Sequence, residues 1–136
     1  MGTQFKDETT IQVLDFRSLF PNLVSTTASK GLQGCTSLKK VTFPYKFETI
    51  AEQLFNTANL LVIVGDEVNG SSLSSIGWGS FVSSQNLVCY ATTPPNGNAP
   101  NVKAFYVPDD SVQAYKTKFS NISGRIKPLS EWSGDR

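Results

Sequence analysis

The stretch "GLQGCTSLKKVTFP", residues 31–44, places small or apolar side chains at Cys35, Leu38, Val41 and Phe43. The steps between them are three, three and two residues, which match neither the 3.6-residue period of a helix nor the two-residue period of a strand. The spacing is typical of a chain that bends between its apolar positions. It predicts one turn of a unit that recurs along the chain.

Two further copies of the pattern follow. The copies begin at Thr27, Ile50 and Ile76, and the second interval is the longer one. Its extra residues fall in "VGDEVNGSSLSSIG", residues 64–77, whose composition indicates a loop. A second register, one residue shorter, remains open for residues 56–64, with Leu60 and Ile63 pointing inward. The three copies consist of Thr27, Leu32, Cys35, Leu38 and Val41, then Ile50, Phe55, Ala58, Leu61 and Val64, then Ile76, Phe81, Ser84, Leu87 and Tyr90.

No single copy is long enough to bury its own apolar positions, so the copies must stack to form a core. The segments of the "LKKVTF" type are expected to be short strands, each hydrogen-bonded to the strand of the next copy. Segments such as "IAEQLFN", residues 50–56, are expected to form a helical turn or an irregular arc. The pattern predicts an α/β repeat solenoid with a small parallel sheet on one face.

Both ends of the chain are expected to cap this stack. "TIQVLDF", residues 10–16, alternates in part and predicts a capping strand. After Pro108, a near capping box at Asp110 is followed by Val112, Tyr115 and Phe119 on one helical face, which predicts a C-terminal capping helix. We expect one domain: an N-terminal capping segment over 1–23, repeats over 24–103, and a strand–helix–strand cap over 104–136.

The composition limits the chemistry and the partners of the chain. Its 136 residues carry a formal charge of +1 and contain no histidine, which removes the commonest general base and zinc ligand. Without a basic patch we expect no nucleic-acid partner, and without a run of about 18 apolar residues we expect no membrane insertion. The two cysteines, Cys35 and Cys89, are expected to be buried thiols, with a single bridge as the alternative.

The strings "LQGCTSLKKVTFP" and "IGWGSFVSSQNLVCYATTPP" resemble repeats of the BspA-like leucine-rich repeat family, and "AFYVPDDSVQAYKTKFSNISGRIKPL" is similar to its closing segment. The resemblance covers about residues 24 to 130 and includes the CxATTPP-like string that starts at Cys89. It departs from the family pattern at Thr27, Leu32, Ala58 and Ser84. The resemblance implies a short leucine-rich-repeat stack that acts as a non-catalytic adhesion or protein-recognition module.

The residues suggest no catalytic, cofactor or metal site. Asp109 and Asp110 are expected to serve the start of a helix, and the Asp66–Glu67 loop lacks the ligand spacing of a calcium site. Candidate contacts with a protein partner are instead aromatic residues outside the apolar pattern and polar residues of a projecting loop. They are Tyr45, Phe47, Asp66, Glu67, Asn69, Trp78 and Trp132. For Phe47, Trp78 and Trp132, packing onto the body of the protein is the alternative.

Two function classes remain. The first is the recognition module, whose partner would be a host protein. The second is a structural or host-recognition component of a larger assembly, such as a bacteriophage particle, bound to a neighbouring subunit or to further copies of itself. The first ten residues, "MGTQFKDETT", contain no apolar export signal, so we expect the cell surface only if a signal has been removed, and an assembly or virion otherwise.

Overall fold

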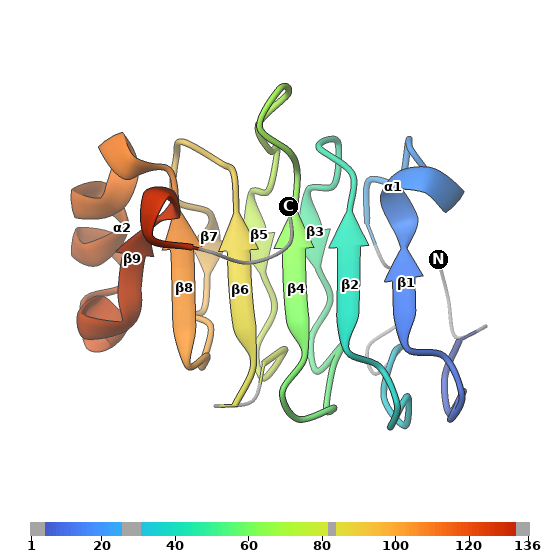
Figure 1. Ribbon diagram of the computed structural model, residues 1–136. Helices are drawn as coiled ribbons and strands as arrows, with labels where there is room; N and C mark the ends of the chain where they lie inside the picture. Colours follow the sequence, from blue (N-terminus) through green and yellow to red (C-terminus); the bar gives the residue numbers. More distant parts are fainter. Residues whose placement is uncertain (1–4, 26–30, 82–83, 133–136) are drawn as a thin grey trace.

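The structure, a computed structural model, describes residues 5–25, 31–81 and 84–132 and is an α/β fold with two parallel sheets (Figure 1). The larger sheet has six strands in the order β1-β2-β4-β6-β8-β9, and the smaller has three in the order β3-β5-β7. The strands of the larger sheet are β1 (Val13–Asp15), β2 (Lys40–Phe43), β4 (Leu61–Val64), β6 (Asn86–Cys89), β8 (Ala104–Val107) and β9 (Ile126–Pro128). The strands of the smaller sheet are β3 (Thr49–Ile50), β5 (Ser75–Ile76) and β7 (Asn96–Gly97).

From β2 to β8 the chain passes alternately through the larger and the smaller sheet, and each strand pairs in parallel with the next strand of its own sheet. The expected parallel strands are therefore confirmed. Val41 lies beside Val62, and Val62 lies beside Leu87. The apolar pattern predicts instead that Val41 lies beside Val64 and that Val64 lies beside Tyr90. This prediction is wrong, because fewer residues separate neighbouring strands of the larger sheet than the pattern requires, both from β2 to β4 and from β4 to β6.

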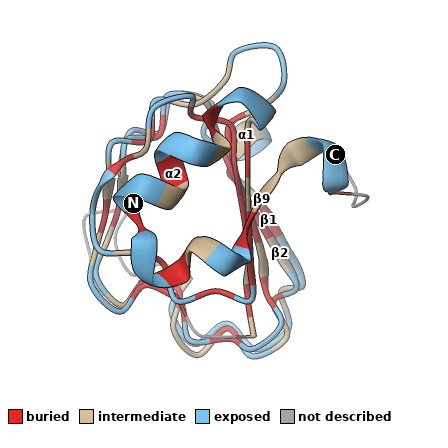
Figure 2. Cartoon of the chain, turned by 90° about the vertical axis from the view of Figure 1, so that its left-hand side faces the viewer, coloured by how far each residue is buried: buried red, intermediate tan, exposed pale blue. Residues whose placement is uncertain are grey.

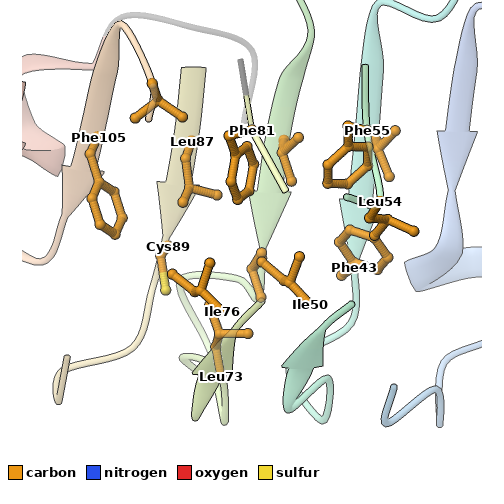
Figure 3. Close-up of a cluster of buried hydrophobic side chains, with 14 of the residues drawn as sticks. Phe43, Ile50, Leu54, Phe55, Leu73, Ile76, Phe81, Leu87, Cys89 and Phe105 are labelled. Atoms are coloured by element: carbon orange, nitrogen blue, oxygen red, sulfur yellow. The ribbon is translucent and has the colours of Figure 1, made fainter. Parts of the chain in front are cut away.

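Apolar side chains from both sheets meet in one core between them (Figure 3). Val41, Val62, Leu87 and Phe105 form one inward row across the larger sheet, and each is fully buried. A second inward row passes through Phe43, Val64 and Cys89. Both cysteines are buried free thiols, as expected.

The second copy of the apolar pattern follows neither predicted register completely. Ala58 is exposed, and Leu61 lies on the outer face of the sheet, so the register containing these two residues is wrong. In the alternative register, Leu60 does point into the core, but Ile63 belongs to the outer face. The two-residue period of a strand, which puts Val62 and Val64 inward, explains the difference. Tyr90 of the third copy also lies on the outer face, and Thr27 of the first copy lies outside the described residues.

Buried polar side chains link successive passages of the chain, meaning the segments that precede β2, β4 and β6 in turn. The Thr57 hydroxyl donates to the carbonyl oxygen of Cys35 at 2.8 Å, and Gln85 Nε2 donates to the carbonyl oxygen of Thr57 at 2.7 Å. Gln85 is fully buried and Thr57 almost so. Because an unpaired polar group in the core would be costly, these bonds allow polar residues at core positions.

Two glycines let neighbouring connections approach closely. A Cβ atom on Gly77 would lie 2.5 Å from the Glu52 backbone nitrogen, and one on Gly97 would lie 2.3 Å from the Ile76 carbonyl oxygen. Gly97 also has a φ of +98°, in the region that favours glycine. The spacing of the smaller sheet thus depends on the absence of side chains at these positions.

Helix α2 (Val112–Lys118) covers one end of the core (Figure 2). The helix buries Tyr115, with Val112 packed beside it, as the helical spacing predicts, and Phe119 is buried directly after the last helical residue. The predicted capping box at Asp110 does not form, because Asp110 lies in a 3-10 turn and α2 begins only after Ser111, whose hydroxyl donates to the Thr92 carbonyl oxygen instead of accepting from the helix. At the other end, β1 is the edge strand that residues 10–16 predict, and the short helix α1 (Phe16–Leu19) follows it.

Candidate partner-binding surfaces

Trp78 is the exposed aromatic residue that the sequence singles out. Its side chain is 60% exposed, whereas the backbone around it is held in place. Gln53 N–H donates to the Trp78 carbonyl oxygen at 2.9 Å, and Gly77 N–H donates to the Ile50 carbonyl oxygen at 2.8 Å. The fold therefore presents a large apolar ring to solvent on a fixed support.

The connection after β4 projects from the larger sheet (Figure 1). It is closed by Asp66, whose Oδ1 accepts from the N–H groups of Val68 at 2.9 Å and Asn69 at 2.7 Å. Asp66 and Gly70 also exchange two backbone hydrogen bonds. The Asp66 carboxylate thus shapes the loop, and Val68 at its tip is 91% exposed. Glu67 and Asn69 are exposed beside it.

The two aromatic residues after β2 differ in position. Phe47 is fully buried and stacks on Phe43 with ring centroids 4.1 Å apart. The prediction that Phe47 contacts a partner is therefore wrong, because the ring completes the core. Tyr45 is half-buried, and the Lys46 ammonium lies 5.8 Å from the centre of its ring.

Trp132 belongs to a second apolar cluster, on the outer face of the larger sheet. Residues 129–132, here called the C-terminal strap, turn back over this face, on the side away from the core (Figures 1 and 2). Trp132 is only 7% exposed and packs with Tyr106, while Ser130 N–H donates to Asp109 Oδ1 at 3.0 Å. Trp132 therefore docks on the body of the protein, and the prediction that it reaches a partner is wrong. The cluster consists of Ile63, Val88, Tyr90 and Trp132, with Leu61, Tyr106 and Leu129 at its margin.

Polar side chains gather on the outer face where β1 meets β2. The Thr42 hydroxyl donates to Asp15 Oδ1 at 2.6 Å, and the Ser18 hydroxyl donates to Asp15 Oδ2 at 3.0 Å. Partial burial raises the pKa of Asp15, but these hydrogen bonds and the nearby Arg17 outweigh it and bring the pKa below its usual value. The apolar cluster of this face is thus the part that the C-terminal strap covers, whereas Val13 at the edge strand stays exposed.

A hollow of about 290 Å³ opens between the connection from β4 to β5 and the connection from β6 to β7. Its walls combine side-chain hydroxyl and amide groups with a few apolar groups, and none of the lining residues is charged. The serine cluster and the "ATTPP" string signal these walls in the sequence, but the pairing of β4 with β6 is needed to bring them together. The lining residues are Ser71, Ser72, Leu73, Ser74, Ala91, Thr92, Thr93, Pro94 and Asn96.

Four exposed apolar residues that the sequence does not single out lie in or after the edge strand β1, and one of them, Val24, lies beside β3 of the smaller sheet. Val13 of the edge strand is exposed, and so are Leu19, Phe20 and Val24 in the segment that follows it. These four are a majority of the six large apolar residues that are exposed in the described part of the chain. Where exposed apolar residues gather on one surface, they favour contact with another protein.

The predicted contact residues do not form one site. Asp66, Glu67 and Asn69 precede β5, Trp78 follows it, and Phe47 and Trp132 are buried. Within residues 5–25, 31–81 and 84–132, no group of three His, Cys, Asp or Glu side chains could hold a metal ion. In the same ranges, no helix is long and apolar enough to cross a membrane.

In comparisons with known proteins, no family model and no curated protein matches this chain.

Proposed function

We propose that the chain is a short BspA-like leucine-rich repeat protein that acts as a non-catalytic protein-recognition module. The alternating parallel strands, with Val41, Val62 and Leu87 as successive neighbours in the larger sheet, support a stack of repeats. The order of strand β8, helix α2 and strand β9 supports the strand–helix–strand closing segment that the resemblance implies. In this proposal the sheets and caps form a rigid support for exposed contact residues.

The observation that carries the proposal is the exposed Trp78 on a fixed backbone. Exposing a tryptophan to water is unfavourable, and tryptophan is enriched among the residues that dominate protein interfaces. The backbone hydrogen bonds on either side of Trp78 reduce the conformational entropy that would be lost on binding. Val68, on the loop that Asp66 closes, is a second exposed apolar contact with a defined support.

The test measures partner binding with and without the Trp78 side chain. Proteins retained from source cultures by the immobilised wild-type chain would be identified and purified, and each affinity would be measured for wild type and for Trp78→Ala. We expect binding to weaken about tenfold to a hundredfold, at an unchanged melting temperature. Thr36→Val, an exposed substitution in a different turn, is the control. Equal affinities of Trp78→Ala and wild type for every partner would contradict the proposal.

The second candidate function is a component of a larger assembly such as a virus particle, and the exposed apolar residues near the β1 edge favour it. Val13, Leu19 and Phe20 would be covered if a neighbouring subunit packed there. Sedimentation of the wild-type chain and of Leu19→Glu distinguishes this candidate from the first. A stable oligomer that Leu19→Glu dissociates would favour the assembly role, whereas a monomer at all concentrations would favour the free recognition module.

A further inference from the structure

We propose that the hollow between the β4–β5 and β6–β7 connections is a binding site for a carbohydrate. This site goes beyond the proposed protein-recognition function and uses other residues. Its volume of about 290 Å³ is at the lower end of the range of roughly 300–1,000 Å³ that small-molecule pockets occupy. That size suits one sugar ring better than a bulky ligand.

The first step of the argument is that polar groups in the hollow are available. Ser71 and Ser74 are already used, because the Ser71 hydroxyl accepts from Leu73 N–H and the Ser74 hydroxyl donates to the Glu48 carbonyl oxygen. The hydroxyls of Ser72, Thr92 and Thr93 have no hydrogen-bond partner among the described residues. Each of these three hydroxyls can both donate and accept a hydrogen bond.

The second step is that the walls are held in position before any ligand arrives. Ser72 N–H donates to the Tyr45 carbonyl oxygen, and Asn96 N–H donates to the Ser74 carbonyl oxygen, both at 2.8 Å. The Ser111 hydroxyl holds the Thr92 carbonyl oxygen at 2.8 Å, and Lys118 Nζ donates to Asn96 Oδ1 at 3.1 Å. A preformed site loses less entropy on binding than a site that must be ordered.

The third step is the chemistry of the ligand. A free phosphate or sulfate fits the first hollow poorly, because none of its lining residues is charged and the nearby Lys118 ammonium already donates to Asn96 Oδ1. A peptide strand could pair here only with β7, the edge strand that contributes Asn96, and its two residues offer little backbone for such pairing, since β4, β5 and β6 each have a neighbouring strand on both sides. A sugar ring presents hydroxyls that both donate and accept, together with C–H groups that match the apolar surface of the half-buried Pro94.

The hollow also continues beyond Pro94. A second hollow of about 420 Å³ shares Pro94 and extends along α2 past Gln113 and Thr117 to Lys118. Two adjoining hollows fit a chain of two sugar units better than a single compact ligand. The geometry thus points to a short oligosaccharide, with one ring in each hollow.

The experiment records amide NMR spectra of the full chain during titration with glucose, galactose, mannose, N-acetylglucosamine, maltose, lactose and chitobiose. We expect at least one sugar to cause saturable shifts at Ser72, Thr92, Thr93 and Asn96, and a disaccharide to extend them to Gln113. Thr93→Val, which replaces the hydroxyl by a methyl group of similar size, should weaken binding about tenfold without changing the melting temperature. Thr36→Val is the matched control and should bind as wild type does.

Three results would overturn the inference: no saturable shift with any of the seven sugars, shifts that Thr93→Val leaves unchanged, or shifts confined to residues outside both hollows. The outcome is independent of the protein-recognition proposal, because Trp78→Ala should leave sugar binding intact. Conversely, Thr93→Val should leave the affinity for a protein partner intact.

Discussion

The Tyr115 hydroxyl donates a hydrogen bond of 2.7 Å to the carbonyl oxygen of Ala91. Tyr115 belongs to the capping helix α2, and Ala91 belongs to the chain just after β6, so the bond joins the cap to the body of the protein. The Tyr115 ring also meets Phe105 edge to face at 5.3 Å. A helix of seven residues is too short to be stable alone, so α2 depends on contacts of this kind.

Removing this hydroxyl should weaken the cap. Tyr115→Phe keeps the ring but leaves the buried Ala91 carbonyl without its partner, so we expect a loss of about 1–3 kcal/mol in the free energy of unfolding. Urea unfolding followed by fluorescence measures the change. Tyr106→Phe, on the half-buried outer face, is the control and should alter stability by less than about 0.5 kcal/mol. Equal effects of the two variants would contradict the role of the Ala91 bond.

Adding one methyl group at Gly77 should be costly. The new Cβ would lie 2.5 Å from the Glu52 backbone nitrogen and 2.8 Å from the Ala51 carbonyl carbon, so the backbone would have to move. We expect Gly77→Ala to lower the free energy of unfolding by about 1–3 kcal/mol. Gly124→Ala is the matched control, since a Cβ there meets nothing within 4 Å. If Gly77→Ala melts at the wild-type temperature, the close approach is not a constraint.

Alkaline pH should destabilise the protein through its buried ionisable groups. Burial raises the pKa of the Cys35 and Cys89 thiols and of the Tyr115 hydroxyl. The unfolded chain therefore loses these protons at a lower pH than the folded chain. The stability is complete below the thiol pKa of the unfolded chain, about 8.5, and should fall as the pH rises beyond it.

The measurement is the urea midpoint from pH 7 to 10 for wild type and for the double variant Cys35→Ala, Cys89→Ala. The fall above about pH 8.5 should be shallower in the double variant, because its two thiols no longer contribute. Parallel curves would show that the thiols ionise equally easily in both states. A wild-type midpoint that rises with pH would contradict the sign of the shift.

The two tryptophans should respond differently to truncation. Trp132→Ala removes a ring that is 7% exposed and uncovers the outer cluster, so we expect a loss of about 3 kcal/mol and stronger binding of a hydrophobic dye. Trp78→Ala removes a ring that is 60% exposed and should cost less than about 0.5 kcal/mol. Thermal melts and dye fluorescence of both variants give the comparison. The opposite order of stabilities would show that the C-terminal strap does not protect the sheet.

The parallel strands could be predicted because the "LKKVTF" type of segment marks each one. The register of the second copy could not be settled, because Leu61, Val62, Ile63 and Val64 are all apolar. Such a run is expected where a strand is covered on both faces. Here the second cover is the C-terminal strap, which lies far along the chain, beyond β9. Its packing cannot be inferred from spacing within the copies.

The exposure of individual aromatic residues was equally hard to predict. Phe47 and Trp78 both lie outside the apolar pattern, but the Phe47 ring is buried against Phe43, whereas the Trp78 ring is exposed. The hydroxyl-lined hollow was missed because its two walls are far apart in the sequence and each resembles an ordinary loop.

The hydrogen bonds from Thr57 to Cys35 and from Gln85 to Thr57 bear on how such a chain can change in length during evolution. Each of these side chains finds its acceptor in the preceding passage of the chain, so the passages are not interchangeable. Deleting residues 44–64 would bring Gln85 next to Cys35 and remove Thr57, and duplicating them would place two Thr57 side chains in succession. Lineages that gain or lose a unit here should therefore show a compensating change at the position of Thr57 or Gln85.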